Sequence, residues 1–204
     1  MEKIDLWETE HQLREKGYTA ICGVDEAGRG PLAGPVCAAA VILPMDLAIP
    51  GLNDSKKLTE KKREELYPII CEQAVAYGIA FADHKEIDSV NILQATFLAM
   101  ERAIAQLKGK ADFALIDGNR EKDFGLPVQT LIKGDSRSAN IAAASVLAKV
   151  TRDRYMLEMA KEYPGYGFEI HKGYGTKAHY DALTRLGPCS IHRMSFLRKF
   201  YGEK

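Results

Sequence analysis

Two apolar, β-prone runs, residues 18–24 and 36–43, flank a segment rich in glycine and proline that reads GVDEAGRGPLAGP over residues 23–35. Such runs on either side of a short glycine turn predict an antiparallel pair of strands. The first run ends at two adjacent carboxylates, Asp25 and Glu26. Carboxylate oxygens at the end of a strand are the ligands that hard divalent cations prefer. This segment therefore predicts a strand, metal-binding acids and a turn, in that order.

The turn contains Gly28, Gly30 and Gly34, together with the cation Arg29. Because glycine has no side chain, backbone N–H groups can approach a ligand closely, and a guanidinium suits phosphate. Acids next to a phosphate-binding turn indicate chemistry on a phosphodiester. A dinucleotide-binding turn is disfavoured, because the third glycine of GxGxxG is missing and acids stand where the phosphate would sit.

The length of 204 residues predicts one domain, and an apolar fraction of 46% is ordinary for a water-soluble protein. No apolar stretch is long enough to cross a membrane, and residues 1–17 lack the apolar core of a secretory signal. The cysteines form no CxxC pair, which favours free thiols in a reducing compartment. We expect a cytoplasmic monomer with four unpaired cysteines, namely Cys22, Cys37, Cys71 and Cys189.

The formal net charge is zero, but the charges are distributed unevenly. Residues 55–63 hold five basic side chains and one acidic one, and residues 171–204 hold seven basic and two acidic. A charged run such as 55–65 is by itself typical of the solvated face of a helix. Together with the acids elsewhere, these two basic segments favour a metal-dependent nuclease whose lysines and arginines contact phosphates.

Periodicity and capping residues predict an α/β fold, a mixed sheet with helices on both faces. The alanine-rich start of the fourth expected helix, residues 139–148, allows its backbone to lie close to the sheet. Residues 53–57 form an expected polar loop. The expected strands cover residues 18–24, 36–43, 75–82, 113–116 and 128–132. The expected helices cover 6–16, 59–71, 86–107 with a break near Asn91, 138–163 and 176–186.

Four carboxylates fall at or just after the ends of expected strands: Asp25, Glu26, Asp117 and Asp135. If these strands are neighbours, the acids meet at one edge of the sheet, where sites form in α/β proteins. Like charges at such distances repel, and a divalent cation removes the repulsion. The all-oxygen set predicts Mg²⁺ or Mn²⁺, with two ions assisting an in-line phosphoryl displacement.

Each acid also has a purely structural interpretation. Asp135 can face the N-terminus of the helix that Ser138 begins, and Asp117 can start a turn with Gly118 and Asn119. Adjacent acids in a strand normally point to opposite faces, so Asp25 and Glu26 share a site only if the strand bends. The pattern favours a helix-surface ion pair for Asp153, and structural or surface positions for the lone histidines, namely His84, His171, His179 and His192. Phosphate contact remains the alternative for His171 and His179.

Four blocks of the sequence resemble the bacterial ribonuclease HII family, the type 2 ribonucleases H. They are GVDEAGRGPLAGPV (23–36), NDSKK (53–57), Asp135 with IAAASVLAKVTRD (141–153), and KGYGTKAH (172–179). Their order and spacing span nearly the whole chain. Ribonuclease HIII is a poorer match, because that family has a lysine where Arg29 stands here and a large domain before the catalytic part.

The resemblance implies a ribonuclease H-like mixed five-stranded sheet flanked by helices, with a C-terminal helical segment (about 164–204). Residues 1–17 lie outside the matching blocks, and we expect them to form an N-terminal helical extension to which no role is assigned. It implies hydrolysis of the RNA strand of RNA/DNA hybrids, and cleavage 5′ of single ribonucleotides in duplex DNA that leaves 3′-hydroxyl and 5′-phosphate ends. The four acids match the catalytic, metal-binding set. Substrate contacts are implied for the glycine turn, whose amides can read a 2′-hydroxyl, and for a tyrosine and two lysines: Gly28, Arg29, Gly30, Tyr174, Lys56 and Lys57.

Two other classes of function remain open at this point. A DNA-specific nuclease, transposase or junction resolvase of the same fold uses similar acids and ignores the 2′-hydroxyl. A non-catalytic hybrid-binding protein needs basic segments without an intact acidic set, and the complete set argues against it. The residues up to Lys204 show no recognisable partner-binding peptide, so attachment to a replication clamp is left open.

Overall fold

The computed structural model describes residues 5–202, so residues 1–4 of the expected N-terminal extension and residues 203–204 lie outside it. A five-stranded sheet has the strand order β3-β2-β1-β4-β5. Strands β1, β2 and β3 pair antiparallel, whereas β4 and β5 continue parallel to β1. The strands are β1 (Ile21–Ala27), β2 (Val36–Ile42), β3 (Ala76–Ala82), β4 (Phe113–Asp117) and β5 (Val128–Leu131). The expected mixed α/β sheet, with its first two strands antiparallel, is confirmed.

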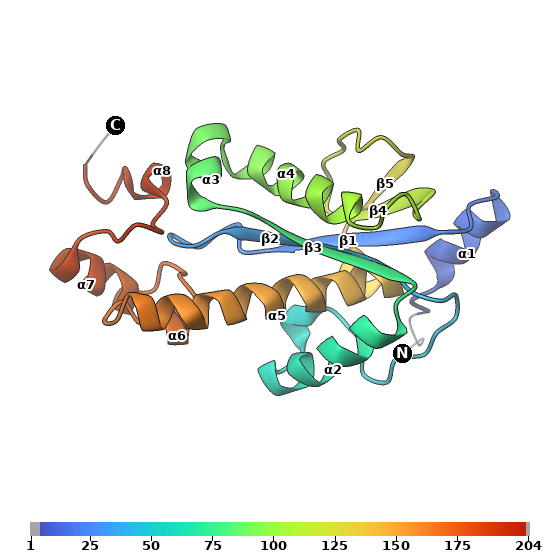
Figure 1. Cartoon of the computed structure of the whole chain (residues 1–204), viewed down its shortest axis with the longest axis horizontal. Helices are drawn as coiled ribbons and strands as arrows, with labels where there is room; N and C mark the ends of the chain where they lie inside the picture. The colour runs from blue at the N-terminus through green and yellow to red at the C-terminus, as the bar shows by residue number, and fades with distance from the viewer. Residues whose placement is uncertain (1–4, 203–204) are drawn as a thin grey trace.

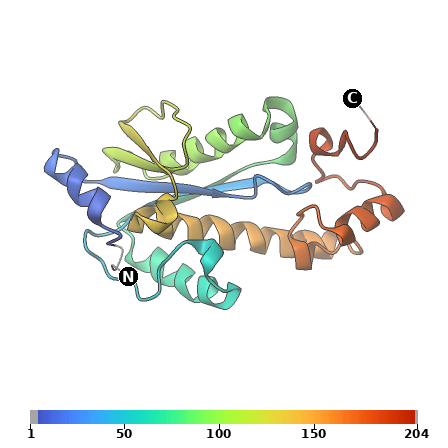
Figure 2. The same ribbon diagram turned by 180° about the vertical axis from the view of Figure 1, so that it is seen from behind.

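Helices cover both faces of the sheet (Figure 1), with α3 and α4 on one side and α2 and α5 on the other. Figure 2 shows the same layers from behind, with α6, α7 and α8 gathered beyond one end of the sheet. None of the helices within residues 5–202 has the length and apolar character needed to cross a bilayer. The helices are α1 (Glu8–Glu15), α2 (Glu60–Gln73), α3 (His84–Val90), α4 (Ile92–Ala105), α5 (Ala139–Glu162), α6 (Phe168–His171), α7 (Lys177–Leu186) and α8 (Met194–Leu197), with 3₁₀ turns η1 (Ser55–Lys57) and η2 (Gly134–Ser136).

Helix starts agree with the capping residues of the sequence. The side chains of Thr59, Ser138 and Thr176 accept hydrogen bonds from backbone N–H groups in the first turns of α2, α5 and α7. The break expected near Asn91 separates α3 from α4, and Asn91 there has a positive φ of 71°. Local sequence signals therefore determine where these helices begin.

Helix α5 lies unusually close to β1. A Cβ atom at Gly23 would lie 2.2 Å from the carbonyl carbon of Asn140, so only glycine fits there. Buried alanines on both elements allow the approach: Ala39 of β2 and Ala143 of α5 belong to the same apolar cluster. The sequence-based expectation of a small-residue helix against the sheet is thus confirmed.

Helix α1 is attached to the start of α5 through Glu10. This fully buried carboxylate accepts hydrogen bonds from Ser138 Oγ at 2.6 Å and from Asn140 Nδ2 at 3.1 Å. Within residues 5–202 its second oxygen has no hydrogen-bond partner, and burial raises the pKa of Glu10. The N-terminal helix thereby stabilises the end of α5 that follows Asp135.

Candidate active site

Strand alternation places Asp25 and Asp117 on the same face of the sheet. Parallel pairing aligns Val24 of β1 with Ile116 of β4, so the next residues of the two strands, Asp25 and Asp117, come side by side. Both carboxylates lie on the face that α5 covers, because Gly23, two residues before Asp25, contacts that helix. The neighbouring strand ends therefore bring two acids together, as the sequence suggested.

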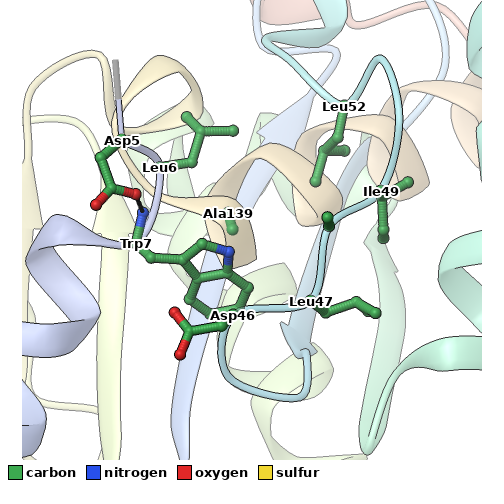
Figure 3. A pocket seen from close by; sticks show the side chains of 9 residues that line it. Asp5, Leu6, Trp7, Asp46, Leu47, Ile49, Leu52 and Ala139 are labelled. Atoms are coloured by element: carbon green, nitrogen blue, oxygen red, sulfur yellow. Dashed lines mark hydrogen bonds between the residues drawn. The ribbon is translucent and has the colours of Figure 1, made fainter. Parts of the chain in front are cut away.

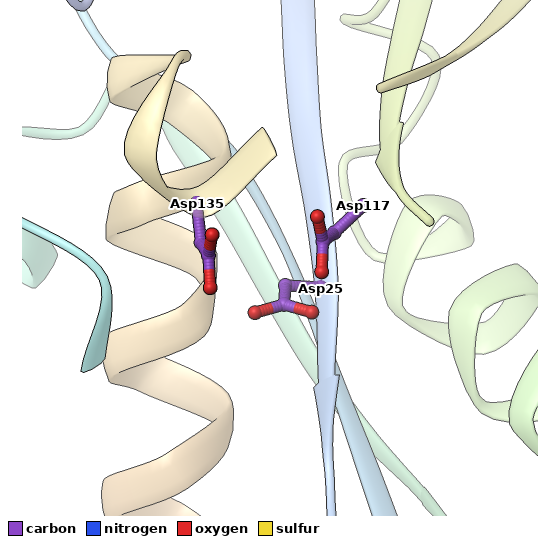
Figure 4. Close-up of side chains that lie close together, drawn as sticks. All are labelled: Asp25, Asp117 and Asp135. Carbon is purple, nitrogen blue, oxygen red and sulfur yellow. The ribbon is translucent and has the colours of Figure 1, made fainter. Parts of the chain in front are cut away.

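The third carboxylate of the site, that of Asp135, comes from η2, the 3₁₀ turn between β5 and α5. One oxygen from each of Asp25, Asp117 and Asp135 can be chosen so that all three lie within 4.8 Å of one another. Figure 4 shows these carboxyl groups gathered between β1, the end of β4 and the turn before α5. Asp25 and Asp135 are nearly inaccessible to solvent. The three acids therefore form one compact, water-poor oxygen cluster.

Glu26 lies outside this cluster but close enough for its charge to act on Asp25. Strand β1 continues to Ala27, so alternation turns Glu26 toward the face that α4 covers. Its carboxylate accepts a hydrogen bond of 3.3 Å from the guanidinium of Arg29. The sheet does not bend enough to bring Glu26 within the 4.8 Å cluster, although Asp117 still acts on its charge.

Burial and mutual repulsion both disfavour the charged forms of these acids. Burial, followed by the charges of Glu26 and Asp117, raises the pKa of Asp25 well above its usual range. Burial and the charge of Asp117 likewise raise the pKa of Asp135 to about 6. A bound cation removes this penalty, because it stabilises the charged forms. The acidic triad therefore fits a divalent cation with oxygen ligands.

Lys56 lies beside the acids, at 3.8 Å from Asp135. Burial alone would lower the pKa of Lys56, but the charges of Asp25 and Asp135 outweigh it and raise that pKa. The next lysine, Lys57, faces Asp54 at 3.8 Å instead. Both ammonium groups remain largely exposed. Of these two lysines, Lys56 is therefore the one that borders the carboxylate cluster.

A groove of about 260 Å³ adjoins the acids. Tyr174 is 43% exposed in it and lies close to the glycine turn, since a Cβ at Gly30 would be 3.7 Å from its ring. The groove brings together most substrate-contacting residues that the sequence predicts, and it adds Lys149, which sequence reasoning missed. Its lining is Glu26, Ala27, Gly28, Arg29, Gly30, Ser55, Lys56, Lys149 and Tyr174.

Two buried arginines hold the glycine turn from behind. Arg193 donates hydrogen bonds to the carbonyls of Gly28 at 2.6 Å, Arg29 at 2.8 Å and Gly34 at 2.8 Å. Arg152 donates to three further carbonyls, those of Ala33, Pro35 and Lys172. Each of the three nitrogens of both guanidinium groups thus has a backbone acceptor, which compensates for burying the charge.

This arrangement fixes the direction of the turn's amides. In a planar trans peptide the C=O and the following N–H point in opposite directions. With the carbonyls of Gly28 and Arg29 held by Arg193, the N–H groups of Arg29 and Gly30 face away from it. Within residues 5–202 neither amide has a protein acceptor. The turn therefore presents two oriented donors.

Comparisons with known proteins agree with this geometry. The family model of ribonuclease HII matches residues 22–199. The chain belongs to the ribonuclease HII family. It is similar to ribonuclease HII of Caldicellulosiruptor bescii, with 54% identity over 95% of this chain and 94% of the relative, and to that of Endomicrobium trichonymphae, with 57% identity over 94% and 92%.

A solved structure agrees as well. The ribonuclease H2 of Pyrococcus horikoshii OT3 superposes with a TM-score of 0.71 at 27% identity, covering 87% of this chain and 93% of that one. The ribonuclease H-like fold expected from the sequence is therefore confirmed. As a member of the ribonuclease HII family, the chain is an endoribonuclease that cleaves RNA in RNA/DNA hybrids and ribonucleotides embedded in DNA.

Sequence reasoning about the lone charged residues was less successful. Asp153 forms an ion pair within its helix, with Lys149 at 2.7 Å, but the aspartate is buried and not at the helix surface as expected. His171 and His179 are buried too, which agrees with the structural positions favoured for them and excludes the alternative, direct phosphate contact, in this conformation. Nothing in the sequence around Arg152 distinguishes it from a surface arginine, because its acceptors come from distant segments.

A second cavity, of about 390 Å³, lies near Trp7 and the start of α5 (Figure 3). Its walls are mostly apolar, and its two carboxylates already have partners. Asp5 accepts from the N–H of Trp7, and Asp46 pairs with His11. This cavity therefore offers no group for ribonuclease HII chemistry.

Proposed function

We propose that the acidic triad and the adjoining groove together cut the phosphodiester on the 5′ side of a ribonucleotide, leaving 3′-hydroxyl and 5′-phosphate ends. One observation carries this proposal: the cluster of Asp25, Asp117 and Asp135 opens beside a groove that contains the glycine turn and Tyr174. Because the acids that cut and the turn that recognises the ribose lie on neighbouring surfaces, one bound duplex can contact both.

Asp25, Asp117 and Asp135 are the residues proposed to hold Mg²⁺ or Mn²⁺, since each offers a carboxylate oxygen and no histidine or cysteine belongs to the cluster. Such an ion, when bound, makes a water molecule more nucleophilic and stabilises the leaving oxygen. Glu26 completes the proposed catalytic set from the neighbouring face. Its position beside Arg29 supports a role at the border between the acids and the turn.

The glycine turn is proposed to recognise the ribose. The N–H groups of Arg29 and Gly30 point away from Arg193 and can donate to a 2′-hydroxyl or an adjacent phosphate. DNA lacks that hydroxyl, so these donors would lose a partner at every deoxynucleotide. A polar site left without its partner discriminates more strongly than an apolar pocket does.

Tyr174 is proposed to stack on the deoxyribose that follows the ribonucleotide. Its exposed ring beside Gly30 supports this position. Lys56 is proposed to bind a phosphate next to the acids, and Lys57 to bind one further along the strand. The substrate-contacting part of the C-terminal segment (about 164–204) would then be the stretch around Tyr174.

A paired-substrate assay tests the proposal. Three duplexes of one sequence are compared in Mg²⁺ and then in Mn²⁺: all DNA, DNA with one ribonucleotide, and a continuous RNA/DNA hybrid. We expect a single cut 5′ of the lone ribonucleotide, with a 3′ end that a DNA polymerase extends directly. Equal cutting of the all-DNA duplex would instead favour a DNA-specific nuclease or resolvase of this fold.

Site variants separate cleavage from duplex binding. Asp117→Asn is expected to abolish turnover while duplex binding, measured by fluorescence anisotropy, stays near that of the parent. Asp46→Asn serves as the matched control, because Asp46 is an exposed aspartate that pairs with His11 and does not belong to the acidic cluster. Full turnover by the Asp117 variant would sink the metal assignment.

We also propose that the protein works as a monomer in the cytoplasm. The thiols of Cys22 and Cys37 are buried and unpaired, which supports a reducing compartment. Light scattering of the purified protein, with and without a hybrid duplex, tests the oligomeric state, and fractionation of cells tests the location.

A further inference from the structure

Three histidines, His171, His179 and His192, lie buried together beside the groove, in the part of the molecule built from α6, α7 and the segment before α8. The rings of His171 and His179 stack with their centres 4.5 Å apart. Those of His179 and His192 approach to 5.2 Å. Neither the acidic triad nor the glycine turn accounts for this cluster.

A chain of hydrogen bonds fixes the tautomers of two of these rings. Nδ1 of His192 has three neighbours on Cys189: the backbone N–H at 2.9 Å, Sγ at 3.1 Å and the backbone carbonyl at 3.3 Å. The N–H contact is the shortest, and because a backbone N–H can only donate, it assigns Nδ1 as the unprotonated nitrogen. The proton of neutral His192 therefore lies on Nε2, which is 3.0 Å from Nε2 of His179. That nitrogen must accept, so the proton of His179 lies on Nδ1.

The chain ends at the backbone of Tyr174. Nδ1–H of His179 donates to the Tyr174 carbonyl at 3.0 Å. The N–H of Tyr174 donates to the carbonyl of His171 at 2.9 Å. His171 holds the preceding residue as well, because its Nδ1 accepts from the N–H of Gly173 at 3.2 Å. Histidines thus hold both sides of the Tyr174 backbone, and the Tyr174 carbonyl also accepts from the N–H of Thr176 at 2.8 Å.

We propose that His179, oriented by His192, is a positioning residue that sets the ring of Tyr174 in the groove. This inference rests on the proposed role of Tyr174 in binding the ribonucleotide junction. His179 does not reach the groove itself, since its side chain is fully buried. It acts through the Tyr174 carbonyl, the atom at which the hydrogen-bond chain ends.

A metal site is the alternative for clustered histidines and a cysteine. Here Nδ1 of His192 accepts from Cys189 N–H, and Nε2 of His179 accepts from His192. Both unprotonated nitrogens are therefore occupied, and neither lone pair is available to an ion. A purely apolar packing role is also disfavoured, because each polar atom of the two rings has a directed partner.

The test replaces His179 by two amide side chains, each of which places its amide group near a different nitrogen of the original ring. In His179→Asn the side-chain amide lies near the position of Nδ1 and can still donate to Tyr174. In His179→Gln the amide lies near Nε2 and can contact only His192. His179→Leu removes both contacts. We expect Asn to retain most activity on DNA with one ribonucleotide, and Gln and Leu each to lower kcat/KM about tenfold, the effect of one hydrogen bond.

The Tyr174→Ala background separates positioning from general stability. If His179 acts through Tyr174, adding His179→Leu to Tyr174→Ala causes no further loss of kcat/KM. A second tenfold loss in that background overturns the inference. Wild-type kcat/KM in Tyr174→Ala alone shows instead that the proposed role of Tyr174 is wrong, and the inference falls with it.

A measurement on the unaltered chain keeps the inference testable even if a variant fails to fold. Nitrogen NMR of the histidine side chains reports which ring nitrogen carries the proton. We expect a protonated Nδ1 in His179 and a protonated Nε2 in His192 at neutral pH. The opposite tautomer in His179 removes the donor to Tyr174 and overturns the positioning role, whatever the activity of Tyr174→Ala.

Discussion

The backbone N–H of Gly134 donates a 2.7 Å hydrogen bond to Oδ1 of Asp117. This bond joins the turn that carries Asp135 to the end of β4, so two acids of the triad keep a constant separation. Glycine suits this contact, because a Cβ at position 134 would lie 2.5 Å from Cδ1 of Ile141 and 3.3 Å from the same Asp117 oxygen, so both side chains would have to shift. A backbone atom therefore helps to set the geometry of the carboxylate cluster.

Gly134→Ala is expected to displace Asp135 and weaken cation binding. The Mn²⁺ concentration for half-maximal cleavage should rise about tenfold, because losing a hydrogen bond to a metal ligand commonly weakens metal binding by about this factor. A metal titration of cleavage rate measures this. Adding Ile141→Val removes the nearest clashing atom and should recover part of the affinity. An unchanged Mn²⁺ requirement in Gly134→Ala would contradict the argument.

Asp25→Asn is expected to stabilise the metal-free protein although it abolishes cleavage. Burial and the charges of Glu26 and Asp117 raise the pKa of Asp25, which means that the fold disfavours its charged form. A neutral amide relieves that repulsion. In EDTA the Tm should rise by a few degrees, since about 1 kcal/mol moves Tm by roughly 2–4 °C at this size.

The same variant should show a smaller rise in Tm when Mn²⁺ is added, because one of the proposed metal ligands has been lost. Asp153→Asn is the matched control: Asp153 is also buried but is paired with Lys149, so neutralising it should lower Tm. A lower Tm of Asp25→Asn in EDTA would show that repulsion does not govern the triad.

Arg193→Lys is expected to loosen the glycine turn. One guanidinium bonds three carbonyls here, and a single ammonium group cannot span them. Losing two hydrogen bonds from a charged, buried group should lower the free energy of unfolding by about 2–4 kcal/mol. Urea unfolding measures that loss.

Arg193→Lys should also discriminate less well between DNA with one ribonucleotide and all-DNA duplexes, because the amides of Arg29 and Gly30 are no longer held in one direction. Arg198→Lys, an exposed arginine of the same segment, provides the control and should change neither quantity. Intact discrimination in Arg193→Lys would mean that the turn keeps its shape without this support.

Much of the fold could be predicted from sequence because its signals are local. Thr59, Ser138 and Thr176 cap the helices that they were expected to begin. The end of β1 was less predictable: carboxylates suggest a stop after Val24, but pairing of β1 with β2 extends the strand to Ala27. That extension separates Asp25 from Glu26 by alternation.

The non-local part of the site could not be predicted in this way. Lys56 comes close to Asp135 only after η1 and η2 have packed against α5. Arg152 and Arg193 find their acceptors in the glycine turn far away in the sequence. A lone arginine or histidine gives no sign of burial when its partners are distant backbone carbonyls.

Acid is expected to destabilise the protein through His192. Burial, reinforced by His179, lowers the pKa of His192 from 6.5 to about 4, so the fold accommodates the neutral ring. Its contribution to stability is complete above pH 6.5 and falls as pH drops toward 4, with a total loss of about 3 kcal/mol.

Urea unfolding at several pH values tests this prediction. His192→Gln is the comparison, because glutamine can still donate to His179 but does not titrate. The difference in unfolding free energy between parent and variant should shrink by most of that amount between pH 7 and pH 4.5. Equal pH dependence of the two proteins would show that His192 is protonated without cost.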